Sequence, residues 1–345
     1  MSNKKREPKD IIPLKRAYAA QEIRKDNGNA PIDQAIFQHA ALCQTFFPYK
    51  SQDKSSSPHY WKKEQGRAVL SIQALNHENP ITGETVALGI PYGAKIRLIM
   101  AFINTEIVRT QSSKIEVSDS VTAFIRNDLK LHTDGRTIRQ VKDQLARLAG
   151  CIMQVSFGDV ETGQSHVRRF DIVDGYDLWF PKSPDQKVLW NSYIEISERY
   201  TKGLLEHAIP LDMRAVAALS NNPMALDAYS WLVYRLHRIP RNKPQPITWV
   251  KLYEQFGTGY TRIRDFRAAF LSTLKQVKLV YPDARLEEFK DKKTGISGGL
   301  LLYNSPPAIG HKLYIPAHFK KLKESMEKRA ESEKRLPSPI KKKGK

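Results

Sequence analysis

Apolar and polar positions along the chain predict helices and strands in an order that occurs twice. The first copy begins with a helix over 92–109, in which apolar residues recur at helical spacing. Ser118 and Asp119 suit the start of a second helix that runs to 129. A third helix is expected over 136–149. Strand-like segments follow at 152–157, 167–173 and 193–196.

The second copy repeats the order of helix, helix, turn, helix and hairpin. Asn222 followed by Pro223 suits the start of a helix that runs to His237. Thr248 suits the start of a short helix that ends at Gly257. A third helix is expected over 262–278. It is followed by a hairpin with strands at 284–289 and 299–303 and a turn at 292–295. This is the order of a winged helix, and finding it twice is stronger evidence than either copy alone.

Outside the two copies the pattern is weaker. The apolar spacing of 31–47 predicts one further helix, and 48–66, rich in Ser, Lys and Pro, indicates a loop. Strands are expected at 69–72 and 85–88, on either side of a turn at 77–83.

Together these elements predict an α+β protein of tandem winged-helix domains with flexible basic termini. The domains are expected at 67–205 and 206–320. Residues 1–30 are expected to be a disordered basic N-terminus, and residues 31–66 a helix with a linker. Residues 321–345 are expected to form a basic C-terminal tail.

Composition excludes several classes of protein. The chain of 345 residues has no apolar run near the ~18 residues of a membrane span, and its charged N-terminus lacks the apolar segment of a signal peptide. Two cysteines, Cys43 and Cys151, cannot form a disulfide framework, which favours a reducing cytoplasmic location. The net charge of +20 is concentrated at the ends, with +5 in residues 1–25 and +8 in 312–345. Because basic tails are often only solvated, the total charge indicates nucleic-acid binding weakly.

The third helix of the second copy is the strongest candidate for DNA recognition. One of its faces is an apolar stripe that we expect in the core, with Ile263, Phe266, Phe270, Leu274 and Val277. The rest of its surface is basic or small, with Arg262, Arg264, Arg267, Ala268, Ser272, Lys275 and Lys278. Five basic residues against Asp265 are unusual for a solvated face, where the two signs normally alternate. Arginine can donate two hydrogen bonds to guanine, and small side chains allow close approach to the groove.

The third helix of the first copy leaves two interpretations open. Its basic residues are Arg136, Arg139, Lys142 and Arg147. They could bind phosphates, or Asp143 could pair with Arg139 and Arg147, which lie four residues away on either side. The hairpins offer weaker candidates for backbone contacts, which are His166, Arg168 and Arg169 in the first and Lys290, Lys292 and Lys293 in the second. Acidic residues dilute the second hairpin, at Glu287, Glu288 and Asp291.

The sequence carries no recognisable catalytic or cofactor-binding motif. It has no phosphate-binding loop, no His-x-His pair for the metal of a nicking enzyme, and no Cys-x-x-Cys pair for zinc. Asp171, Asp174 and Asp177 are regularly spaced, but Asp174-Gly175 is first of all a turn signal. We therefore expect a binding protein that is not an enzyme, without a metal, a cofactor or a membrane partner.

Five stretches of the chain form an ordered and specific set across residues 70–320. They are GIPYGAKIRLIMAFINTEIVRTQSSKIEVSDSVTAFIRNDL at 89–129, the basic helix 136–150, WVKLYEQFG at 249–257, RDFRAAFLSTLKQVKLVYPDA at 264–284 and GGLLLYNSPP at 298–307. In these stretches the chain resembles the RepA-type plasmid replication initiators, which pair two winged-helix domains.

The resemblance implies a replication initiator that binds short direct repeats, called iterons, at its own plasmid origin. In such families the C-terminal winged helix recognises bases in the major groove, here with Arg264, Arg267, Ser272 and Lys275. The N-terminal winged helix contacts the DNA backbone and mediates dimerisation. Monomers often bind the repeats, whereas a homodimer in equilibrium with them represses the initiator's own promoter at an inverted repeat. After local melting of double-stranded DNA, the host replication initiator and the replicative helicase are recruited without covalent chemistry.

This division of labour predicts different effects for two variants. Arg264→Ala should weaken iteron binding selectively, and Arg147→Ala should weaken binding to all DNA. Equal losses on specific and random duplexes for both variants would contradict it.

Two other functions remain open on the sequence alone. A dimeric winged-helix transcription regulator without a replication role would share almost all of these features. Direct repeats beside the gene would favour the initiator, and a lone palindrome would favour the regulator. The second alternative is a nicking or primase-like enzyme with an unrecognised site, which metal-dependent cleavage or primer synthesis would reveal.

Overall fold

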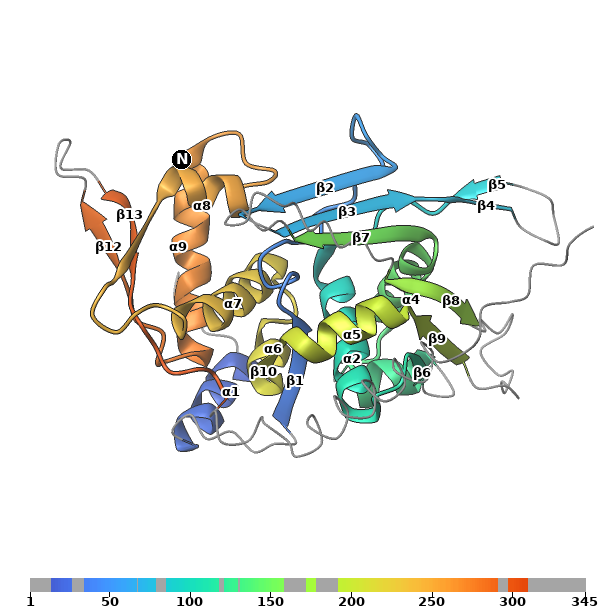
Figure 1. Ribbon diagram of the computed structural model, residues 1–345, viewed down its shortest axis with the longest axis horizontal. Helices are drawn as coiled ribbons and strands as arrows, with labels where there is room; N and C mark the ends of the chain where they lie inside the picture. The colour runs from blue at the N-terminus through green and yellow to red at the C-terminus, as the bar shows by residue number, and fades with distance from the viewer. Residues whose placement is uncertain are drawn as a thin grey trace, which may run out of the picture. The chain divides into compact units, whose positions relative to one another are not determined.

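The described part of the chain combines helices with antiparallel sheets, so the predicted α+β class is confirmed in the computed structural model (Figure 1). The structure describes residues 14–26, 34–66, 68–78, 85–117, 121–129, 131–157, 172–177, 192–290 and 297–309. The chain as far as Ile309 forms one compact unit. Where one winged-helix domain ends and the next begins stays a prediction.

The three helices predicted for the first copy are present. They are α2 (Gly93–Thr110), the short α3 (Val121–Ala123) with a π-helical turn (Phe124–Asp128), and α4 (Gly135–Ala149). The Asp134 side chain accepts a hydrogen bond from the Thr137 N–H at 2.8 Å and so caps α4. The strands of this copy form an antiparallel sheet in the order β6-β9-β8, with β6 (Lys114–Val117), β8 (Val173–Asp177) and β9 (Ser192–Ile196).

The second copy has the same arrangement with one strand more than predicted. Its elements are α7 (Pro223–Leu236), β11 (Gln245–Thr248), α8 (Trp249–Phe256), α9 (Ile263–Val280), β12 (Leu286–Lys290) and β13 (Ser297–Leu302). The predicted caps are confirmed, because Asn222 accepts from the Ala225 N–H and Thr248 from the Lys251 N–H. The sheet order β11-β13-β12 matches β6-β9-β8, since in both the first strand pairs with the third.

The first hairpin is a correction to the sequence-based prediction. The strand at 152–157 is β7 (Cys151–Phe157), and it pairs over its whole length with β3 (Ala68–Ala74). Both strands bury alternate apolar residues, and seven residue pairs join β7 to β3. The hairpin that corresponds to β12–β13 is instead β8–β9. Residues 158–171 lie outside the described part of the chain.

The helix predicted over 31–47 is wrong. Residues Ala35–His39 form the strand β1, which pairs antiparallel with β10 (Ala208–Asp212), and turns follow it. Four of the five β1 side chains are buried, so the strand is covered on both faces. Because its buried residues point to both faces and include the polar Gln38 and His39, the sequence of this strand carries no alternation that separates it from a helix.

The loop predicted over 48–66 is only partly correct. Residues Tyr60–Gln65 form β2, an outer strand beside β3 with alternating exposure. The strand predicted at 85–88 is confirmed as β5 (Thr85–Ala87), but it pairs with β4 (Asn76–Glu78) rather than with 69–72.

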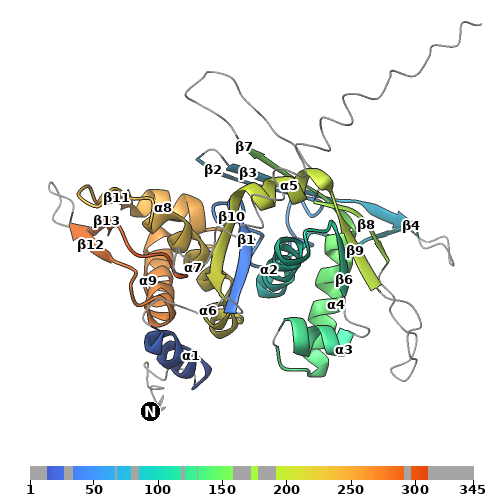
Figure 2. The ribbon, with the colours of Figure 1, turned by 60° about the horizontal axis from the view of Figure 1, so that its bottom comes forward.

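The N-terminus is more ordered than predicted, because Leu14–Lys25 form the helix α1. This helix lies against α6 (Met213–Leu219) and α9, as Figure 2 shows. Its buried residues are Ala19, Ala20 and Ile23, whose spacing places them on one face. Arg16 Nε donates to the Ala218 carbonyl at 3.2 Å, and Asp26 forms an ion pair with Arg214.

A buried ion pair joins the first helices of the two copies. Arg97 on α2 donates from Nε and Nη2 to the two carboxylate oxygens of Asp227 on α7, both at 2.7 Å. The side chains are 6% and 7% exposed. Arg97 also donates to the carbonyl oxygens of Phe47 and Gly93, at 2.7 and 2.5 Å. The Arg97 guanidinium therefore ties α2, α7 and the segment around Phe47 together.

Two further predictions can be checked on the described residues. Cys43 and Cys151 are buried free thiols, and burial raises the pKa of the Cys151 thiol to about 12. Among the helices that the structure describes, none has the length and apolar character to cross a membrane.

Candidate nucleic-acid interface

The N-terminal end of α9 presents two arginines to solvent. The side chains of Arg262 and Arg264 are 73% and 82% exposed. Asp265 lies between them, with its carboxylate oxygens 3.8 Å from Arg262 Nε and 3.7 Å from Arg264 Nε. Ion pairs at such exposure and distance contribute little to stability, so both guanidinium groups can exchange the acid for phosphate or a base edge.

The rest of the predicted face of α9 is also directed outward. Ala268, Ser272, Lys275 and Lys278 are all exposed. Lys278 Nζ donates to the Leu286 carbonyl at 3.4 Å. The small side chains of Ala268 and Ser272 leave the backbone of α9 accessible between the basic ends. A helix of this kind can approach a groove closely.

The opposite face of α9 holds the core of the second copy. Phe266, Phe270, Leu274 and Val277 are buried as predicted, and the ring centroids of Phe256 and Phe270 lie 4.9 Å apart. Ile263 does not belong to this core, because it is 40% exposed. It is the first residue of α9.

Arg267 differs from the other basic residues of α9. Its Nη2 donates to Glu288 Oε2 at 2.8 Å, and its guanidinium lies 5.3 Å from the centroid of the Trp249 ring. The side chain is 34% exposed, less than half as much as Arg264. Arg267 is therefore engaged by protein groups at a position where the sequence predicted a contact with bases.

The basic face of α4 divides into two parts. Arg136 and Arg139 are exposed, and Lys142 is half-buried. Arg139 Nε donates to the Gly135 carbonyl at 3.2 Å. The predicted phosphate contacts of these three residues stay predictions.

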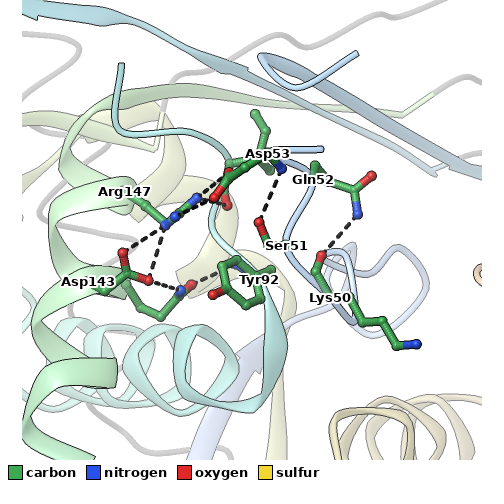
Figure 3. A network of polar contacts seen from close by, with 9 residues as sticks. Lys50, Ser51, Gln52, Asp53, Tyr92, Asp143 and Arg147 are labelled. Carbon is green, nitrogen blue, oxygen red and sulfur yellow. Dashed lines mark hydrogen bonds and ion pairs between the residues drawn. The ribbon is translucent and has the colours of Figure 1, made fainter. Parts of the chain in front are cut away.

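Arg147, whose polar contacts are drawn in Figure 3, is a correction to this face. Its side chain is only 11% exposed. Its Nη1 and Nη2 donate to the two carboxylate oxygens of Asp53 at 2.8 and 2.9 Å. Its Nε donates to Asp143 at 3.0 Å, which confirms the i,i+4 ion pair that the sequence left open. The guanidinium lies 5.1 Å from the centroid of the Tyr92 ring. With every nitrogen engaged, Arg147 holds α4 against the segment around Asp53.

The backbone beside this ion pair requires glycine. Gly89 has a φ of +77°, and a Cβ there would lie 2.6 Å from both Arg147 Nη1 and Asp53 Oδ1. Gly89 therefore allows the chain to pass directly against the carboxylate–guanidinium pair.

We expect Arg147→Ala to destabilise the fold rather than to remove a phosphate contact. The free energy of unfolding should fall by about 2 kcal/mol. The loss is smaller than for a fully buried pair, because the partner acids Asp53 and Asp143 are half-exposed and stay partly solvated without the arginine. Because Arg147 lowers the pKa of Asp53, the contribution of the pair should be present at neutral pH and lost as the pH falls through that lowered pKa. Urea unfolding at two pH values measures both effects.

Arg139→Ala is the matched control for this prediction, because it removes an exposed arginine from the same helix. It should leave the urea midpoint unchanged. If Arg147→Ala unfolds like the unmodified protein but loses affinity for random duplexes, Arg147 is a phosphate contact after all.

The hairpin candidates lie mostly outside the described residues. This applies to His166, Arg168, Arg169, Lys292 and Lys293, and to the side chains of the regularly spaced Asp171, Asp174 and Asp177. Lys290, at the end of β12, is exposed. Glu287 accepts a hydrogen bond from the Tyr303 hydroxyl at 3.1 Å, so both acids of this hairpin that the structure describes, Glu287 and Glu288, have partners.

Three residues with a part in this surface were missed by the sequence reasoning. Trp249, Glu288 and Ser297 connect α8 and the second hairpin to Arg267. The sequence did show Glu288, as an acid facing a strongly basic helix, but it was counted only as a dilution of the hairpin charge. The stacking partner Trp249 had no sequence signal beyond its position after the Thr248 cap.

Residues 90–251 match the family model described as plasmid encoded RepA protein. The chain carries a RepA-family domain. The predicted resemblance to RepA proteins is thereby confirmed over this segment. The RepA-family segment contains the first copy from α2 onward and ends in α8, so α9 lies just beyond it.

Solved structures add a distant similarity to the RepA-family match. Two crystal structures of domains 2 and 3 of RctB resemble the chain, with TM-scores of 0.45 and 0.41 and sequence identities of 10% and 13%. They cover 77% and 76% of this chain and 99% and 96% of theirs. A TM-score below 0.5 does not establish a common fold, so no inference rests on them. No curated protein sequence gives a significant match.

Proposed function

We propose that the protein initiates plasmid replication by binding direct repeats at its own origin through α9. The observation that carries this proposal is the exposed basic face of α9 in a chain with a RepA-family domain. Helix, strand, helix, helix and hairpin occur in this order in both copies, with β7 inserted before the hairpin of the first, which supports two winged helices as the binding modules. The second copy recognises bases, and the first contacts the backbone with Arg136 and Arg139.

The remaining parts of the proposal follow from the family. Bound monomers promote local melting and recruit the host initiator and the replicative helicase, while a dimer represses the protein's own promoter. Two modules on one chain raise the effective concentration for the second contact. Melting costs about 1.4 kcal/mol per base step, which several copies bound side by side can offset. We propose that the protein acts in the cytoplasm and makes or breaks no covalent bond itself.

Footprinting on the DNA beside the gene, at two salt concentrations, tests this function. The initiator predicts regularly spaced protection over direct repeats that persists at the higher salt. Protection of one palindrome identifies a transcription regulator instead. Binding that disappears at the higher salt without a footprint indicates only contacts of basic residues with phosphates. Cleavage or primer synthesis by the pure protein would reveal an enzyme.

Arg264→Ala should lower affinity for the origin repeat by about 1–3 kcal/mol, with a much smaller effect on random duplex. The reason is that Arg264 is the most exposed arginine on the recognition face and forms only a long ion pair of 3.7 Å with the exposed Asp265. Titration of labelled repeat and random duplexes measures the two affinities.

Arg199→Ala provides the control, because it removes an exposed arginine on α5 (Glu198–His207), outside both recognition helices. Arg199→Ala should lower the affinity for the two duplexes equally and only slightly, as the loss of one positive charge predicts. Equal losses on both duplexes for Arg264→Ala would contradict base recognition by this residue.

A further inference from the structure

Four residues from four elements connect the hairpin β12–β13 to α8 and α9, and we call them the hairpin network. They are Trp249, Arg267, Glu288 and Ser297. Glu288 Oε2 accepts hydrogen bonds from Arg267 Nη2 at 2.8 Å and from Ser297 Oγ at 2.6 Å. Trp249 Nε1 donates to Ser297 Oγ at 3.0 Å. The network closes where Arg267 lies over the Trp249 ring.

The hairpin network has a fixed end in the core. Trp249 is 5% exposed and packs edge-on against Phe270, with centroids 6.5 Å apart. Its other end lies on β12, which is the outer strand of the sheet and pairs with β13 alone in that sheet. The contact of Arg267 with Glu288 therefore ties an outer strand directly to the helix that we propose binds DNA.

The hairpin network pairs an acid, Glu288, with an arginine of the basic helix α9, Arg267. Glu288 is an acid beside a face that we propose binds phosphates, and its side chain is 37% exposed. Left unpaired, it would repel the DNA backbone. Arg267 compensates this charge, and its interaction with Trp249 favours the same orientation of the guanidinium. A residue held on two sides in this way is poorly placed to reach a base as well.

We propose that Arg267 is a positioning residue, which fixes the second hairpin against α9 through Glu288 and does not itself contact DNA. This inference rests on the proposed function, because it assumes that α9 and the hairpin bind one duplex together. Arg264 and Arg267, three residues apart on one helix, then have different tasks. Arg264 contacts the base pairs, and Arg267 sets the angle of the hairpin.

Binding by the variants Arg267→Ala, Glu288→Ala and the double variant tests this division. We expect each single variant to lower affinity for the origin repeat by roughly 10-fold, with the double variant no weaker than either, because all three break one unit. The slope of log affinity against log salt should not change, since no phosphate contact is lost. If Glu288→Ala tightens binding while Arg267→Ala weakens it and reduces the slope by about 1, Arg267 contacts DNA directly.

Hydrogen exchange of the free protein provides a readout that does not depend on DNA. Arg267→Ala and Glu288→Ala should both accelerate amide exchange over 286–290, and Arg264→Ala should not. Unchanged exchange in both variants would overturn the positioning role even if the unmodified protein binds the repeats. Faster exchange in a protein that gives no footprint would instead refute the proposed function, because the hairpin network would then hold the hairpin for another purpose.

Discussion

Asp227→Ala is expected to lower the free energy of unfolding by about 3–5 kcal/mol, because it leaves the guanidinium of Arg97 buried without its counter-charge. The pair is 6% and 7% exposed and doubly hydrogen-bonded, so solvent cannot replace the lost carboxylate without opening the structure. Arg97→Met should cost a similar amount, since it also removes the donors to the Phe47 and Gly93 carbonyls. Urea unfolding followed by circular dichroism measures both.

Glu206→Ala is the control for this prediction, because it removes an acid whose side chain is 45% exposed. Its free energy of unfolding should stay within about 0.5 kcal/mol of the unmodified protein. If Asp227→Ala changes the free energy of unfolding by as little as Glu206→Ala does, the buried pair contributes no more to stability than an ion pair on the surface. Because this pair joins α2 to α7, its loss should also separate the unfolding transitions of the two copies.

Gly299→Ala is expected to cost about 3 kcal/mol or more, because a side chain at this position has no space. A Cβ on Gly299 would lie 2.0 Å from the Ile247 carbonyl oxygen and 2.7 Å from Thr248 Cα. Both atoms belong to the backbone of β11, which pairs with β13 in register at Thr248 and Gly299. The clash can be relieved only by separating the two strands, and α8 begins directly after β11.

The effect of Gly299→Ala should extend to DNA binding, because Ser297 and Trp249 flank the disturbed strands. The measurements are the urea midpoint and the affinity for the origin repeat. Gly135→Ala is the matched control, since nothing lies within 4 Å of a Cβ there and alanine favours the first turn of α4. A midpoint for Gly299→Ala equal to that of the control would show that β11 and β13 can shift without loss.

The helices were predictable from the sequence because their signals are local. Asn222 and Thr248 cap α7 and α8 from within three residues, and the apolar stripe of α9 repeats within its own length. The strands were harder, because β1 and β10 pair residues 35–39 with 208–212, and neither segment contains a signal for the other. The pairing of β7 with β3 was missed for the same reason.

The candidate site shows the same limit at the level of single residues. The exposure of Arg264 follows from its place opposite the apolar stripe. The burial of Arg147 does not, because Asp53 lies 94 residues away in a segment that the sequence assigned to a loop. Likewise Arg267 and Glu288 are 21 residues apart and meet only when β12 folds back beside α9. A helical wheel shows which way a residue faces, but it does not show what the rest of the chain places there.

The buried pair of Arg97 and Asp227 makes the two copies of the repeated unit different from each other at one equivalent position. Each is the fifth residue of the first helix of its copy, so equivalent positions of the repeated unit carry opposite charges. If the two copies descend from one ancestral module, this position has diverged into a complementary couple. A chimaera made of two first modules would face arginine with arginine in the interior, and one made of two second modules would face aspartate with aspartate. The modules are therefore not interchangeable, and engineered versions must keep one of each.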